Sequence, residues 1–469
     1  MRSKFNNILQ IGISNFTTIF AGLVVGFILP KILSIEDYGY FRAFTLYVTY
    51  IGFFSLGIID GIVLLHGGED YKDIDKPKFR AYFIWYTIVH LSFTIAVLLC
   101  SLLLIKGEYK YIFILFSMNI IALNFAGYFQ QISQITQRFR EYSSRNIVRS
   151  ILTIASVLII YLLNKSAISI NYKVYVMFIL ISNYTLTMWY IFTYRDIVFG
   201  PYYNLKKIFR EIVTLIKMGF PLLFANLCSI LILTIDRQLI NILFGNTQFA
   251  LYSFAYNILS LVTVATSAIS IVLYPTLKRT TINTLKYYYS SLVTAMLCFL
   301  FGAISIYFPL VIFMKWYLPN YIESLTVFRV ILPGLVISST ITVVMHNYYK
   351  VLNDNMKYFK KSIIILVLSI FINLIVYAMF KTVLAISFAS IITMLIWYFY
   401  IESYFVVKYN YKPLKNTSYM LLMILIFYLT TGITNHYLGF AIYFILYVII
   451  TIVYYYHYIK PATHYLTKS

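Results

Sequence analysis

Long apolar runs separated by short polar breaks dominate this chain of 469 residues. A helix needs about 20 apolar residues to cross the hydrocarbon layer of a bilayer, and the chain offers about fourteen runs of suitable length. We predict membrane-spanning helices near residues 7–33, 40–65, 80–105, 111–135, 147–163, 173–193, 218–243, 250–275, 287–314, 324–349, 362–380, 382–405, 417–437 and 439–458. The pattern therefore predicts an all-α polytopic membrane protein of about 14 transmembrane helices.

Composition and charge separate this chain from soluble proteins and from nucleic-acid-binding proteins. Hydrophobic residues make up 61% of the chain and charged residues only 11%, whereas a soluble domain carries roughly a quarter charged residues. The excess of 37 Lys and Arg over 15 Asp and Glu gathers in alternate breaks, as the positive-inside rule requires if both termini are cytoplasmic. We interpret the positive charge as membrane topology, and we expect no nucleic-acid partner.

The longest break, residues 194–217, predicts an amphipathic helix on the cytoplasmic surface, because basic residues alternate there with apolar ones. A short motif around Ala43-Phe44 recurs around Ala255-Tyr256, six spans later and therefore in the same orientation. We predict an N-terminal six-helix bundle (1–193), a connector (194–217), a second six-helix bundle (218–405), and two extra helices with a cytoplasmic tail (406–469). A substrate cavity is expected between the two bundles.

Several short motifs along the chain resemble those of Wzx-type polysaccharide biosynthesis proteins, which belong to the multidrug and oligosaccharidyl-lipid exporter superfamily. The resemblance implies a flippase in the bacterial plasma membrane. Such a protein moves an undecaprenyl-pyrophosphate-linked oligosaccharide from the cytoplasmic to the outer leaflet by alternating access. The residues that carry it are Leu29 to Gly39, Gly57-Ile58-Ile59-Asp60-Gly61, His66-Gly67-Gly68, Gly219-Phe220-Pro221, Asp236-Arg237 and Tyr274-Pro275.

A few charged residues lie within the predicted spans, where charge is costly and usually faces a wet cavity or a partner. Arg237 and Arg329 are candidates for binding pyrophosphate, because guanidinium groups match phosphate oxygens. Asp60 and Asp236 are candidates for ion coupling, since a poorly solvated carboxylate can carry a proton. The structural alternatives are snorkelling to the headgroups, an ion pair between Asp236 and Arg329, and capping of a helix end by Asp60.

The fourth span carries a polar stripe at helical spacing, formed by Asn124, Gly127, Gln131, Gln134 and Arg138. Amides facing lipid would leave hydrogen-bonding groups unmet, so the stripe should face water or other helices. Asn124, Gln131 and Gln134 are therefore candidates for binding sugar hydroxyl groups. Alternatively, the stripe holds neighbouring helices together.

Other chemistry finds little support in the sequence. The six histidines lack metal-ligand spacing, no phosphate-binding loop is present, and we expect no metal, no cofactor and no catalytic residues. The expected partners are the lipid-linked oligosaccharide, membrane lipid and a polysaccharide polymerase or other assembly proteins. Three alternatives remain open: a multidrug exporter of the same superfamily, a membrane-embedded enzyme of glycan assembly, and a scaffold for assembly enzymes.

Overall fold

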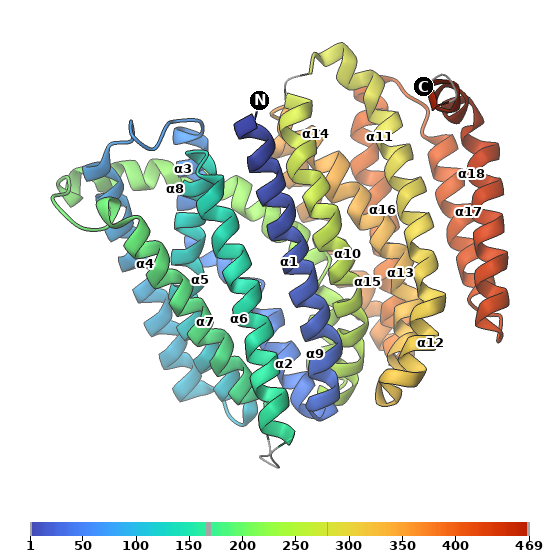
Figure 1. Cartoon of the computed structure of the whole chain (residues 1–469), viewed down its shortest axis with the longest axis horizontal. Coiled ribbons are helices and arrows are strands. Elements are labelled where there is room, and N and C mark those ends of the chain that lie inside the picture. Colours follow the sequence, from blue (N-terminus) through green and yellow to red (C-terminus); the bar gives the residue numbers. More distant parts are fainter. Residues whose placement is uncertain (1, 166–169, 279, 467–469) are drawn as a thin grey trace. The chain divides into compact units, whose positions relative to one another are not determined.

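The computed structural model describes residues 2–165, 170–278 and 280–466, and within these ranges every regular element is helical (Figure 1). Among the described residues, 11 helices are long and apolar enough to cross a membrane, or up to 12 if one bent pair forms a single span. A shorter apolar helix, Leu414–Thr430, adds to these. The prediction of an all-α polytopic membrane protein is confirmed.

Backbone contacts divide the chain into two compact units, Met1–Ser253 and Phe254–Ser469. In the first unit, α1 lies along α6, and α8 lies against α3. Its helices are α1 (Arg2–Ile32), α2 (Ile35–Val48), η1 (Ile51–Ser55), α3 (Ile58–His66), α4 (Lys76–Leu104), α5 (Glu108–Ile135), α6 (Phe139–Lys165), α7 (Tyr172–Thr193), η2 (Arg195–Ile197), α8 (Leu205–Ile232) and α9 (Ile235–Leu243).

Helix α5, which carries the predicted polar stripe, is the interior helix of the first unit. It contacts α2, α3, α4, α6 and α7, and 67% of its apolar window is buried, against 11% for α4. An interior helix can carry amides because neighbouring helices supply their hydrogen-bonding partners. The polar stripe therefore lies on a span that has protein on most sides.

The second predicted span is broken, and its two parts, Ile35–Ser55 and Ile58–His66, meet at 57°. Leu56 and Gly57 adopt left-handed backbone conformations, with φ of 51° and 83°, which end the first helical segment. Gly57, just before α3, and Gly61 within it face Gly219 of α8, and the two helices approach closely because none of the three has a side chain. A Cβ atom built on Gly219 would lie 2.0 Å from the carbonyl oxygen of Gly57. The second predicted span, near residues 40–65, is therefore bent within its length, at Leu56 and Gly57.

Helix α8 joins the amphipathic connector segment to the start of the seventh predicted span without a break. It buries Ile208, Ile212 and Leu215 on one face and continues past residue 217 to Ile232. A short break at Leu233 and Thr234 separates it from α9. The connector is therefore part of the first unit's packing through its contact with α3.

Helix α10 begins within the first unit, and the remaining helices form the second. The continuous segment α13–η5–α14 is its core, with 89% of its apolar window buried, and it contacts α16. The two C-terminal helices contact each other and also α11 and α12. The bounds are α10 (Asn246–Lys278), α11 (Ile282–Ala303), η3 (Ile304–Ile306), α12 (Tyr307–Tyr317), η4 (Pro319–Tyr321), α13 (Ser324–Ser339), η5 (Thr340–Met345), α14 (His346–Val351), α15 (Asn355–Phe380), α16 (Val383–Tyr409), α17 (Leu414–Thr430) and α18 (His436–Leu466).

Candidate functional site

A cavity of about 330 Å³ lies within the first unit and brings together three of the predicted site residues, Asp60, Asn124 and Gln131. Its wall comes from the end of α2, the η1 segment, α3, α5 and one residue of α8. Gln134 does not line it, whereas Gln130 does. The complete lining is Val48, Ile51, Gly52, Ser55, Ile59, Asp60, Leu123, Asn124, Gly127, Gln130, Gln131 and Leu223.

The break in the second span explains why a cavity forms here. Irregular backbone at membrane depth is tolerated where it lines a wet cavity or is buried in protein, and η1 lies opposite the polar stripe of α5. A Cβ atom built on Gly127 would have no neighbour within 4 Å, so this glycine leaves space beside the amides. Arg138 lies beyond Ile135, where α5 ends, and therefore does not continue the stripe.

Asn124 lines the cavity and also joins two segments of its wall. Its side-chain amide donates hydrogen bonds to the carbonyl oxygens of Ile51, at 3.3 Å, and of Ile120, at 2.9 Å. The first bond fixes η1 against α5, so Asn124 holds the cavity wall in place as well as lining it. Gln130 and Gln131 are half-buried, and their amides are the groups best placed to meet a polar ligand.

A series of polar contacts leads from this cavity towards α9. Tyr50, next to the cavity residue Ile51, hydrogen-bonds with Thr234 at 2.6 Å and accepts a hydrogen bond from Gln238 at 3.2 Å. Further along α9, Asn241 donates to the Tyr47 hydroxyl at 3.3 Å. These bonds hold α9 against α2 and bring Arg237, the neighbour of Gln238, into the same region of the unit.

Arg42 was not predicted as a site residue, yet its guanidinium lies near enough to that of Arg237 for the two charges to repel. The Arg42 guanidinium also lies 5.9 Å from the ring centres of Tyr38 and Phe41. The Arg237 guanidinium also donates a hydrogen bond to the carbonyl oxygen of Leu233, at 3.3 Å.

The carboxylates of the predicted site have local partners. Asp236 is 2% exposed and accepts hydrogen bonds from the Tyr252 hydroxyl, at 2.6 Å, and from the backbone N–H of Arg237, at 2.7 Å. Asp60 is half-buried in the first turn of α3, where the helix dipole favours negative charge. Of the two, Asp60 is the one that lines the cavity.

Arg329 lies in the second unit and binds the end of α17. Its guanidinium donates to the Thr431 hydroxyl at 2.8 Å and to the Tyr428 carbonyl oxygen at 2.7 Å. It lines a separate, largely apolar cavity of about 630 Å³ together with Lys315 and His436. Arg237 and Arg329 thus belong to different units, and Arg329 forms its hydrogen bonds at the C-terminal end of α17.

Among residues 2–165, 170–278 and 280–466, no group of three or more His, Cys, Asp or Glu side chains is arranged to hold a metal ion.

Comparisons with known proteins agree with this architecture. The chain resembles the lipid II flippase MurJ in an inward closed conformation, with a TM-score of 0.72 and 14% identity over 97% of this chain and 100% of that one. It also resembles a Pyrococcus furiosus transporter of the MOP superfamily (TM-score 0.57, 12% identity, 86% and 95% covered) and the Vibrio cholerae MATE transporter VcmN (0.58, 12%, 87% and 98%). No curated protein matches the sequence significantly.

The sequence itself identifies the family. Residues 5–281, more than half of the chain, match the family described as polysaccharide biosynthesis protein. The match includes residues 5–253 of the first unit, and with them the cavity, Arg42 and Arg237. The chain therefore belongs to the polysaccharide biosynthesis protein family, and its fold is shared with flippases and transporters of the MOP superfamily.

Proposed function

We propose that this protein is a flippase for surface polysaccharide biosynthesis, which moves an undecaprenyl-pyrophosphate-linked oligosaccharide from the inner to the outer leaflet by alternating access. Membership of the polysaccharide biosynthesis family and the fold shared with a lipid II flippase support the proposal. The observation that carries it is the amide-lined cavity of the first unit, joined through Tyr50 and Gln238 to the region of Arg42 and Arg237.

The chemistry of this region suits the two polar parts of such a substrate. Amides donate and accept hydrogen bonds, as sugar hydroxyl groups require, and Gln130 and Gln131 provide two of them. One arginine guanidinium can bind two phosphate oxygens at once. Arg42 and Arg237 are the two arginines that we propose for this contact. A cavity of about 330 Å³ lies at the low end of the range for small-molecule sites, so it would hold part of a glycan at a time.

The multidrug exporter is the second candidate, because the fold is also that of MATE transporters. The positive charges of Arg42 on α2 and Arg237 on α9 disfavour organic cations, which makes this candidate the weaker one. We propose transport rather than catalysis because the structural relatives are transporters and flippases. We further propose that the protein lies in the bacterial plasma membrane with both termini cytoplasmic, and that a polysaccharide polymerase acts on its product.

The proposal is tested by flipping of lipid-linked oligosaccharide in vesicles containing the purified full chain. Arg42→Gln and Arg237→Gln should each slow flipping by about tenfold, since a charge-assisted contact contributes roughly 1.5–3 kcal/mol. Lys106→Gln is the matched control, because Lys106 is exposed between α4 and α5 and lies outside the cavity lining. Normal flipping by the double arginine variant would contradict the phosphate site.

A further inference from the structure

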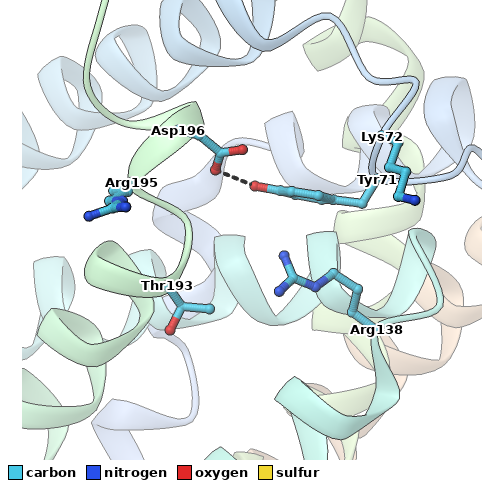
Figure 2. A pocket seen from close by; sticks show the side chains of 6 residues that line it. All are labelled: Tyr71, Lys72, Arg138, Thr193, Arg195 and Asp196. Carbon is cyan, nitrogen blue, oxygen red and sulfur yellow. Dashed lines mark hydrogen bonds between the residues drawn. The ribbon is translucent and has the colours of Figure 1, made fainter.

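A second pocket of about 580 Å³ lies in the first unit, where three segments that connect helices meet. The connection between α3 and α4 contributes Tyr71 and Lys72, and the turn between α5 and α6 contributes Arg138. The end of α7 and the η2 segment complete the wall with Thr193, Arg195 and Asp196. Figure 2 shows the Arg138 guanidinium directed into the space between Tyr71, Asp196 and Thr193, with Lys72 and Arg195 at opposite outer edges of the pocket. The predicted topology places all three connections on the cytoplasmic side.

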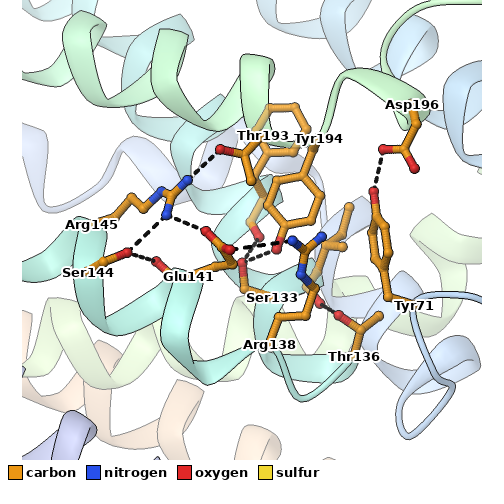
Figure 3. A network of polar contacts seen from close by, with 12 residues as sticks. Tyr71, Ser133, Thr136, Arg138, Glu141, Ser144, Arg145, Thr193, Tyr194 and Asp196 are labelled. Atoms are coloured by element: carbon orange, nitrogen blue, oxygen red, sulfur yellow. Dashed lines mark hydrogen bonds and ion pairs between the residues drawn. The ribbon is translucent and has the colours of Figure 1, made fainter.

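Arg138 is held rigidly between two aromatic rings. Its guanidinium carbon lies 4.5 Å from the ring centre of Tyr71 and 4.8 Å from that of Tyr194. Each ring is itself fixed, because the Tyr71 hydroxyl donates to Asp196 at 2.6 Å and the Tyr194 hydroxyl hydrogen-bonds with Ser133 at 2.7 Å (Figure 3). Stacking on both faces leaves the edge of the guanidinium available, in a fixed orientation, for a planar or tetrahedral anion.

The charge of Arg138 is only partly neutralised. Its ion pair with Glu141 is long, at 3.4 Å, and the second oxygen of Glu141 binds Arg145. One carboxylate is thus shared between two arginines, as Figure 3 shows. Arg145 is further occupied by Trp189, whose ring centre lies 4.1 Å from its guanidinium, so Arg138 is the member of this network that faces the pocket.

The other charged residues of the lining give the pocket an excess of positive charge. Asp196, the one acidic residue of the lining, is already paired with Lys76, at 2.8 Å, and with Tyr71. Burial alone would raise the pKa of Asp196, but hydrogen bonds from Lys76 and Tyr71 lower it below its usual value. In the part of the chain that the structure describes, neither Lys72 nor Arg195 forms an ion pair. Asp70 and Asp73 lie on the same connection as Lys72 but do not line the pocket.

We infer that this pocket binds a phosphate group, presented by Arg138 between its two tyrosines and held by Lys72 and Arg195. A purely structural clamp would need Arg138 and the two rings alone. It would not require two further cations, both exposed and without ion pairs, around a hollow of this volume. Phosphate chemistry is shared by the headgroup of an anionic lipid and by a soluble phosphate compound, and the pocket has room for either.

Two binding measurements on the purified full chain separate these sources. In detergent, calorimetric titration with inorganic phosphate tests for a soluble ligand. In nanodiscs of phosphatidylcholine with or without phosphatidylglycerol, native mass spectrometry tests for retention of the anionic lipid. Phosphate binding without lipid retention assigns a soluble ligand, and lipid retention that excess phosphate does not displace assigns a lipid headgroup; both results support the phosphate site.

The variants decide whether the bound phosphate occupies this pocket. Lys72→Gln and Arg195→Gln should each weaken binding about tenfold, equivalent to about 1.4 kcal/mol, and they leave the ring clamp intact. Arg138→Lys should weaken binding similarly, because an ammonium group cannot replace the stacked fork. Lys207→Gln is the matched control, since Lys207 is exposed on α8 and outside the lining. Absence of binding by the wild type, or binding that Lys72→Gln and Arg195→Gln leave unchanged, would overturn the inference.

Discussion

The close crossing of α3 and α8 offers a sharp test of the packing in the first unit. Adding a methyl group to Gly219 would place its Cβ atom 2.0 Å from the carbonyl oxygen of Gly57 and 2.4 Å from the backbone nitrogen of Gly61. At Gly61 the new Cβ atom would lie 2.3 Å from the carbonyl oxygen of Leu215. All of these neighbours are backbone atoms, so no side chain can rotate away and the two helices must separate.

The expected loss of stability follows from this geometry. Ordinary contact begins at about 3.4 Å, so α3 and α8 would have to move apart by more than 1 Å, and overpacking of this kind costs roughly 1–3 kcal/mol. For a unit of this size, that corresponds to a fall of roughly 2–12 °C in the apparent Tm. Gly219→Ala and Gly61→Ala should both show it in thermal unfolding of the purified protein in detergent.

Gly12→Ala is the matched control for this experiment. Gly12 lies in α1, where an added Cβ atom would meet nothing within 4 Å, and alanine favours a helix over glycine by about 1 kcal/mol. Its apparent Tm should therefore be unchanged or slightly raised. If Gly219→Ala and Gly61→Ala were as stable as the control, the close contact between α3 and α8 would be wrong.

Further predictions concern individual polar groups. Asp60→Asn should weaken the pH dependence of transport, measured as flipping against pH; an unchanged response would leave Asp60 with a role at the helix terminus only. Gln131→Leu should slow glycan transport severalfold without lowering the apparent Tm, because Gln131 faces the cavity. Arg329→Ala should reduce stability by roughly 1–3 kcal/mol, since Arg329 binds the end of α17; thermal unfolding measures this. Burial alone would raise the pKa of Asp354, but hydrogen bonds from Tyr404 and two lysines lower it to about 2. The stabilisation by Asp354 is therefore present above its ordinary pKa and lost as the pH falls towards 2, so Asp354→Asn should lower the Tm at pH 7 and match the wild type near pH 2.

Local periodicity was enough to predict the helices and the polar face of α5. Steps of three and four residues placed Asn124, Gly127 and Gln131 on one side of a helix, and these three residues do line one cavity. The neighbouring Gln130 also lines this cavity and was missed, although it lies three residues after Gly127 and so fits the same steps. Gln134 was included in the stripe on spacing alone, although the cavity ends before it.

Features that depend on contacts between distant segments could not be predicted. The break at Leu56 and Gly57 is stabilised by the backbone of α8, more than 150 residues later in the chain. The pair formed by Arg42 and Arg237 likewise requires α9 to fold back onto α2. The clamp around Arg138 needs rings from two other connections. The sequence shows these residues only as isolated glycines, charges and tyrosines, without a spacing that links them.

The leaflet distribution of lipid-linked oligosaccharide tests the proposed function most directly. It can be measured in cells with and without this protein by adding an external enzyme that cleaves only glycan exposed on the outer leaflet. Depletion should leave the glycan protected on the cytoplasmic leaflet, and the wild type should restore its cleavage while the double variant of Arg42 and Arg237 should not. An unchanged distribution on depletion, with altered polymer length or decoration, would contradict flipping and favour an assembly enzyme or a scaffold.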